Sequence, residues 1–325
     1  RRRFGRGGGA DDPGDGPDEG DTAAGLPVPL DDDFEDDDFD DDGDDERGPP
    51  GPSLSERLSA GGGLASRVLV AVPGIAVAIA AVAAGGLVFA LTVSLLAVLA
   101  LFEFYNLTAA WRPLRWAGYL SVIGAVILAY ALTDSERGVL IGVAAGVGLV
   151  AVAGLILARK EDVTGRMAVT AFGLLYVGLP FGMLMATREL PHGAAAVANV
   201  LVGTWVFDTA SFAGGKLWGS RKIAPRTSPG KTLEGLVVGV VVGTLSVGVA
   251  GLYMDWINGA QSLILGACIC VAGFVGDLFE SMLKRDVGAK DSGRILMGHG
   301  GILDRFDALM FATVTGYFVT VALVY

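Results

Sequence analysis

The chain has 325 residues, of which 52% are hydrophobic, and its formal net charge at pH 7 is −11. Apolar runs of about 17–22 residues recur from Val68 to Tyr325, and runs of this length cross a bilayer as helices. The composition therefore excludes an ordinary soluble domain. It predicts an all-α, polytopic integral membrane protein.

The negative charge is concentrated at the N-terminal end. Residues 1–60 hold 20 Asp and Glu against 6 Lys and Arg, whereas residues 61–325 hold 15 against 18. The first segment is rich in Gly, Pro and acidic residues and has little apolar surface to offset chain entropy. We therefore predict a disordered acidic tail at 1–60 and a transmembrane domain at 61–325.

About nine transmembrane helices are expected. The apolar block from Val68 to about Phe104 is too long for one span and fits two helices broken at Gly85-Gly86. The later spans are predicted at 116–132, 138–157, 167–187, 194–214, 233–254, 260–282 and 302–324. Lys and Arg concentrate in alternate loops, which places those loops and the N-terminus in the cytoplasm and the C-terminus outside.

A charged segment of about thirty residues, Gly276 to Asp307, lies between two strongly apolar runs. Asp304 and Asp307 are three residues apart at the start of the last span, so a helix would place both on one face. Asp277 ends the preceding span, and the intervening loop can fold it back toward them. Carboxylates brought together repel one another unless a cation lies between them. The segment therefore predicts a Mg²⁺ site, with Mn²⁺ as an alternative ion.

The same segment carries groups suited to phosphate. Lys284 and Arg285 follow Ser281 at the end of the predicted helix, and Arg suits bidentate phosphate recognition. The Gly300-Gly301 pair would let backbone N–H groups approach an anion closely. The further candidates in this segment are Lys290, Asp291, His299 and Arg305. For His299, the roles of general base, phosphate donor and loop scaffold all remain open.

A second candidate segment runs from Asp208 to Gly235. Its Ser228-Pro229-Gly230-Lys231-Thr232 stretch resembles a phosphate-cradling turn, although the spacing is not that of a Walker A motif. Thr232 and Glu234 open an apolar span whose N-terminus would favour an anion.

Both segments resemble the signatures of the phosphatidate cytidylyltransferase (CDP-diacylglycerol synthase) family. The segment from Ser281 to Asp307 matches S-x-x-K-R, four residues, K-D, a short spacer and H-G-G-x-x-D-R-x-D. Ser228 to Gly235 matches the family's S-P-x-K-T-x-E-G, and Asp208 matches an acidic position upstream. One departure is Met297, where the family usually has Pro or Gly. The resemblance covers about residues 65–325.

The resemblance implies that CTP and phosphatidate react to give CDP-diacylglycerol and pyrophosphate with Mg²⁺ present. On that basis we expect Asp277, Asp304 and Asp307 to bind the metal. Lys231, Lys284, Arg285 and Lys290 would bind the CTP phosphates and the leaving pyrophosphate, with Ser228 and Ser281 bonding phosphate oxygens. The expected partners are CTP, phosphatidate and the bilayer of a bacterial-type inner membrane, with the site facing the cytoplasm. No nucleic acid partner is expected, and a homodimer is left open.

Two other functions compete with this interpretation. A CTP-dependent lipid kinase would move the γ-phosphoryl group and leave CDP, but the complete H-G-G-x-x-D-R-x-D segment argues against it. An ion-coupled transporter would place its carboxylates near the bilayer midplane, often within inverted repeats. Here the carboxylates are predicted on one side of the membrane, and the sequence shows no such repeat.

Overall fold

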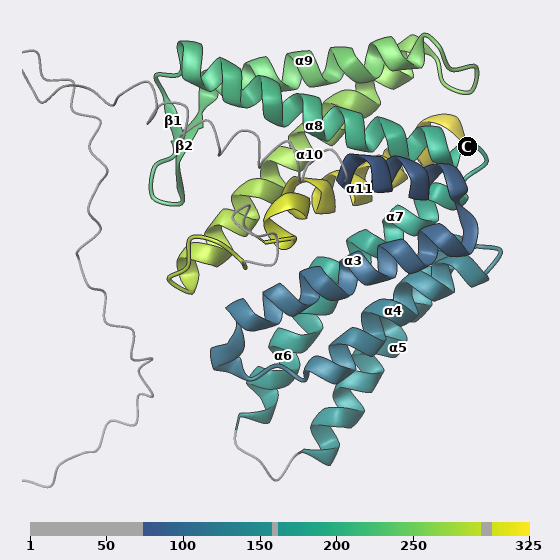
Figure 1. Ribbon diagram of the computed structural model, residues 1–325, viewed down its shortest axis with the longest axis vertical. Helices are drawn as coiled ribbons and strands as arrows, with labels where there is room; N and C mark the ends of the chain where they lie inside the picture. The colour runs from purple at the N-terminus through teal and green to yellow at the C-terminus, as the bar shows by residue number, and fades with distance from the viewer. Residues whose placement is uncertain (1–73, 158–161, 294–300) are drawn as a thin grey trace, which may run out of the picture. The chain divides into compact units, whose positions relative to one another are not determined.

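The computed structural model describes residues 74–157, 162–293 and 301–325. The predicted acidic tail lies outside these ranges. Helices dominate the described residues, as Figure 1 shows. They are Gly74–Ala84, α3 (Gly86–Leu107), α4 (Arg115–Ala131), α5 (Ser135–Ile156), α6 (Val163–Gly173), α7 (Leu179–Glu189), α8 (Gly193–Trp218), α9 (Leu233–Gly251), α10 (Gly259–Asp286) and α11 (Leu303–Val324). Two short helical turns, η1 (Ala109–Trp111) and the π-helical η2 (Leu174–Gly178), complete the set.

Seven helices in the described ranges are long and apolar enough to cross a membrane. They include a continuous helix over Val163–Glu189, in which η2 joins α6 to α7. Gly74–Ala84 and α4 are apolar but shorter. Each predicted span thus has a helix, while the count of nine crossings stays a prediction. Large apolar side chains such as Leu155 and Phe212 are more than 70% exposed, as lipid contact requires.

The helix break predicted at Gly85-Gly86 is present. Gly85 has φ +61°, a left-handed conformation that favours glycine, and it ends the helix Gly74–Ala84. The Arg188 Nε atom, at the end of α7, donates to the Val82 carbonyl oxygen at 2.8 Å. A side chain at Gly85 would overlap the Arg188 guanidinium. The break therefore depends on both the backbone conformation and the space at Gly85.

Small residues set the close packing of the helices near the site. α9 packs along α8, and Figure 1 shows the two lying side by side. A Cβ at Gly239 would meet Phe207 and Ser211 of α8, and one at Gly243 would meet Cys270 of α10. Glycine at such positions allows backbones to approach, the usual basis of helix association in membranes. α10 in turn packs against α11, which brings the two carboxylate-bearing helices together.

The described residues also include one small β-hairpin. β1 (Lys222–Ala224) pairs antiparallel with β2 (Ser228–Thr232), with Lys222 opposite Thr232 and Ala224 opposite Ser228. The sequence predicted only a turn at Ser228–Thr232. The structure adds a paired strand on the N-terminal side, and the hairpin leads directly into α9.

Candidate active site

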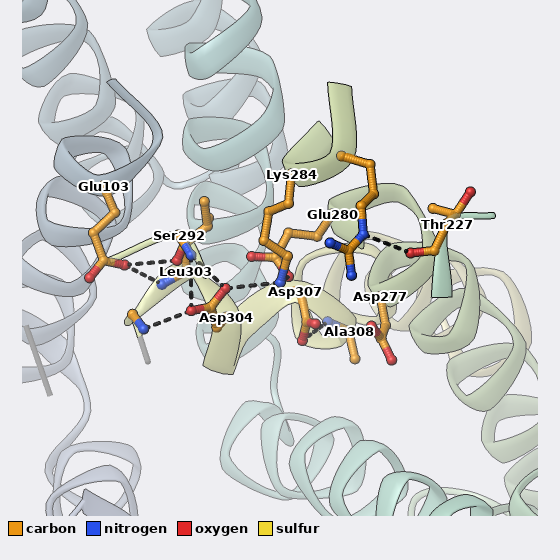
Figure 2. A network of polar contacts seen from close by, with 12 residues as sticks. Glu103, Thr227, Asp277, Glu280, Lys284, Ser292, Leu303, Asp304, Asp307 and Ala308 are labelled. Carbon is orange, nitrogen blue, oxygen red and sulfur yellow. Dashed lines mark hydrogen bonds and ion pairs between the residues drawn. The ribbon is translucent and has the colours of Figure 1, made fainter. Parts of the chain in front are cut away.

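Lys284 lies between two carboxylates near the C-terminal end of α10. Its Nζ atom is 2.9 Å from Glu280 Oε2, one turn earlier, and 3.0 Å from Asp304 Oδ1 at the start of α11 (Figure 2). Glu280 is fully buried and the other two side chains are about 15% exposed or less. Such burial makes each charge costly unless it is paired, so this group of three holds α10 and α11 together through Lys284.

Asp304 is further engaged by the loop between these helices. Its carboxylate accepts hydrogen bonds from Ser292 N at 3.1 Å and from Gly301 N at 2.7 Å. The sequence predicted that the backbone N–H groups at Gly300-Gly301 would approach an anion. In this structure the Gly301 N–H donates to a carboxylate of the protein itself, that of Asp304. With Lys284 and two amides as donors, Asp304 fixes Ser292 and Gly301 of this loop.

A second ion pair joins the hairpin to α10. Lys231 Nζ of β2 is 2.7 Å from Asp277 Oδ1, and both side chains are largely buried. Asp208 of α8 lies within electrostatic reach of both residues. The Arg285 Nε atom also reaches back to the Thr227 carbonyl oxygen at 3.4 Å. The two sequence segments predicted to act together are thus in direct contact.

Asp307 lies one helical turn beyond Asp304 and faces other carboxylates. Its Oδ1 accepts from Ala308 N at 2.7 Å, and it interacts electrostatically with Asp277 and Glu280. Figure 2 shows these residues grouped below Lys284. Several carboxyl groups therefore lie together between α10 and α11.

The carboxylates of the site match the needs of a divalent cation only in part. Within residues 74–157, 162–293 and 301–325, no three His, Cys, Asp or Glu side chains are arranged to hold a metal ion. Asp304 is bonded to Lys284 and two amides, and Asp277 is paired with Lys231. Asp307 accepts from one amide and lies within electrostatic reach of Asp277. A hard cation between Asp277 and Asp307 would offset the charges of the two carboxylates, and these two have fewer donors within the protein than Asp304 has.

Several predicted substrate-binding residues make contacts within the protein. Thr232 Oγ1 accepts from Gly235 N at 3.2 Å and caps α9. Glu234 accepts from Ser220 N, Ser220 Oγ and Arg221 N, which holds the chain that enters the hairpin. Their roles toward a substrate stay predictions.

The remaining predicted residues lie around this cluster or outside the described ranges. Lys290, Asp291 and Arg305 are exposed, and Ser228 and Ser281 are half-buried. His299 and Gly300 lie outside the described residues.

Two buried polar residues were not singled out from the sequence. Glu103 of α3 is 1% exposed and accepts from Leu303 N at 2.7 Å. The Tyr176 hydroxyl on η2 has no hydrogen-bond partner among the described residues and lies within electrostatic reach of Glu280 and Asp307. A lone acid in the apolar run Ala100–Tyr105 was a signal available in the sequence, because ionisable groups within spans are usually functional. The π-helical turn that carries Tyr176 had no such signal.

Fold and site together define a class: a polytopic helical membrane protein with a buried centre of lysines and carboxylates near helix ends. The chain belongs to the Cytidylyltransferase family, whose sequence profile matches residues 65–323. It is similar to the phosphatidate cytidylyltransferase of Staphylococcus aureus strain COL, at 34% identity over 252 residues, 75% of this chain and 94% of that protein. The phosphatidate cytidylyltransferase of Staphylococcus epidermidis RP62A is 33% identical over 251 residues, with the same coverage.

Another relative is an uncharacterised protein of Escherichia coli K12, YnbB. It is 43% identical over 138 residues, which is 42% of this chain and 46% of that protein. The similarity to this relative thus covers less than half of either chain.

Proposed function

We propose that this protein is a phosphatidate cytidylyltransferase, which transfers CMP from CTP to phosphatidate and releases pyrophosphate. The observation that carries the proposal is the ion pair between Lys231 and Asp277, because it brings two motifs of the predicted reaction into one site. The staphylococcal relatives support it through their names and nearly full-length coverage. Neither a lipid kinase nor a transporter has comparable support.

The reaction joins two polyanions. An oxygen of the phosphatidate phosphate attacks the α-phosphorus of CTP, a new P–O bond forms, and the bond to the β-phosphate breaks as pyrophosphate leaves. Phosphoryl chemistry of this kind needs alignment and charge neutralisation more than covalent catalysis. The protein must therefore supply cations and hold the two phosphates in line.

Lys231 and Lys284 are two partly buried cations of the site. Each is paired with a carboxylate, which holds its ammonium group in position for a polyanion. Arg285 and Lys290 are exposed at the end of α10 and beyond it, where they would meet the outer phosphates. Ser228 and Ser281 would donate hydrogen bonds to phosphate oxygens.

Mg²⁺ would be held by Asp307 and by Asp277, which also pairs with Lys231, and Asp304 would join if it exchanges one of its present contacts. When bound, the ion would neutralise phosphate charge at the reacting centre. The protein's own part is to keep two carboxylates facing one another at the junction of α10 and α11.

We further propose that the site faces the cytoplasm, where CTP is found, and that phosphatidate enters sideways from the inner leaflet. The basic loops support this orientation. The oligomeric state, including a homodimer, stays a prediction.

The direct test is to give the purified protein CTP, phosphatidate in mixed micelles and Mg²⁺. The expected result is a cytidine-containing lipid that does not form when either substrate is omitted. No such lipid from folded protein would overturn the proposal.

A further inference from the structure

Glu103 is a buried acid in the middle of an apolar sequence. It lies in α3 between Phe102 and Phe104, and it is 1% exposed. A carboxylate at such a position is costly unless hydrogen bonds stabilise it. Its partners therefore indicate what the position is for.

Those partners are about 190–200 residues away, in the loop that follows α10 and at the start of α11. Glu103 Oε2 accepts from Leu303 N at 2.7 Å and from Ser292 Oγ at 3.4 Å. Leu303 is the first residue of α11. Figure 2 shows Glu103 facing this loop from α3, with Ser292 and Leu303 between it and Asp304.

Asp304 bonds to Ser292 of the same loop and to Gly301 before α11, from the opposite side. Ser292 donates its backbone N–H to Asp304 and its hydroxyl to Glu103. Gly301 N donates to Asp304, while Leu303 N donates to Glu103. Two carboxylates from different helices thus fix the residues that precede and begin α11.

The backbone leaves room for this carboxylate and little more. A Cβ at Gly293 would come within 2.5 Å of Glu103 Oε1, and one at Gly301 would overlap Oε2. Glycine at both places allows the backbone to close around the carboxylate. Oε1 has no hydrogen-bond partner among the described residues.

We propose that Glu103 is a positioning residue for CMP transfer. By fixing the first turn of α11, it keeps Asp304 on Lys284 and Asp307 opposite Asp277. It acts through these residues and does not touch substrate. The proposal rests on the proposed function. The effect of Glu103 on the order of the first turn of α11 can nevertheless be measured without turnover.

The test uses three variants of the full chain and one control. Glu103→Ala removes both acceptor contacts, Glu103→Gln keeps one acceptor oxygen, and Ser292→Ala removes only the hydroxyl donor. Glu136→Ala is the matched control, because Glu136 of α5 accepts from the Tyr317 hydroxyl farther along α11. Hydrogen exchange of the peptide over residues 301–307 is measured without substrate, and kcat and KM for CTP are measured with it.

For Glu103→Ala, exchange at 301–307 should rise about tenfold, as loss of a hydrogen bond to a charged acceptor implies. Its kcat should fall at least about tenfold while KM for CTP stays within about threefold, because positioning acts mainly on the transition state. Glu103→Gln and Ser292→Ala should show smaller changes in the same direction, and Glu136→Ala should match the wild type.

If Glu103→Ala and Glu136→Ala showed equal changes in hydrogen exchange and in kcat, Glu103 would only stabilise the fold, and the proposal would be overturned. If Glu103→Ala does not fold, wild-type exchange and kcat in both Glu103→Gln and Ser292→Ala would overturn it equally. A wild type that makes no cytidine lipid refutes the proposed function instead, and the exchange result still stands by itself.

Discussion

Lys231 and Asp277 form a 2.7 Å ion pair between β2 and α10, and both side chains are largely buried. The pair connects the hairpin before α9 to the helix that carries Lys284. It holds the Lys231 ammonium group at the site. The geometry predicts that the two residues act as a unit.

Lys231→Ala is expected to lower kcat/KM about 100-fold, because a buried cation facing the polyanion is lost. Asp277→Asn should have an effect of similar size, and the double variant should lose much less than the product of the two. Lys222→Ala, on the exposed face of β1, is the control and should keep wild-type activity. Independent, multiplicative losses would contradict the coupling.

Substitutions of Asp304 and Asp307 should differ in their effects on the stability of the fold and on turnover. Asp304→Asn weakens contacts to Lys284 and two amides, so it should lower the free energy of unfolding by about 1–3 kcal/mol as well as activity. Asp307→Asn removes a carboxylate that faces Asp277 and Glu280, so it should not destabilise the fold. It should nevertheless lower turnover by orders of magnitude and raise the Mg²⁺ concentration required.

Thermal unfolding in detergent and Mg²⁺ titrations of activity would measure both effects. Near-normal activity of Asp307→Asn at all Mg²⁺ concentrations would refute its assignment to the metal. A fully stable Asp304→Asn would show that its contacts do not hold the loop.

Gly85→Ala tests the helix break. The substitution places a Cβ at φ +61° and against the Arg188 guanidinium, so it should destabilise the protein by about 1–3 kcal/mol. Gly124→Ala in α4 is the control, because a Cβ there meets no atom within 4 Å, and it should be neutral or slightly stabilising. Both variants should keep their activity per folded molecule. An unfolding midpoint for Gly85→Ala equal to that of the control would contradict the steric account.

Sidedness can be tested with single cysteines in a Cys268→Ala, Cys270→Ala background. Asp286→Cys, exposed at the end of α10, should react with an impermeant thiol reagent in inside-out vesicles. Thr133→Cys, exposed between α4 and α5, should react in sealed right-side-out vesicles. The reverse pattern would place the site away from cytoplasmic CTP.

The sequence predicted the helices well because long apolar runs have few other solutions. It also predicted that Lys231, Lys284 and the Asp277, Asp304 and Asp307 set would gather. It could not say which lysine pairs with which carboxylate, because the partners come from different elements. The assignment of Asp304 to the metal stays a prediction, and the structure adds that Asp304 is bonded to Lys284 and the loop.

Glu103 shows the other limit of sequence reasoning. Its acid side chain stands out in α3, but no local pattern indicates a partner 200 residues away at Leu303. The hairpin is a similar case, since Ser228–Thr232 becomes a strand only through pairing with Lys222–Ala224. Both the partner of Glu103 and the strand at Ser228–Thr232 depend on contacts that the local sequence does not indicate.

The central claim is that the α-phosphorus of CTP is attacked and pyrophosphate leaves. The most direct measurement gives the purified protein phosphatidate, Mg²⁺ and CTP labelled separately at the α- and γ-phosphates. α-Label should appear in the lipid product and γ-label in released pyrophosphate. If γ-label entered the lipid and CDP were released instead, the protein would be a lipid kinase and not a cytidylyltransferase.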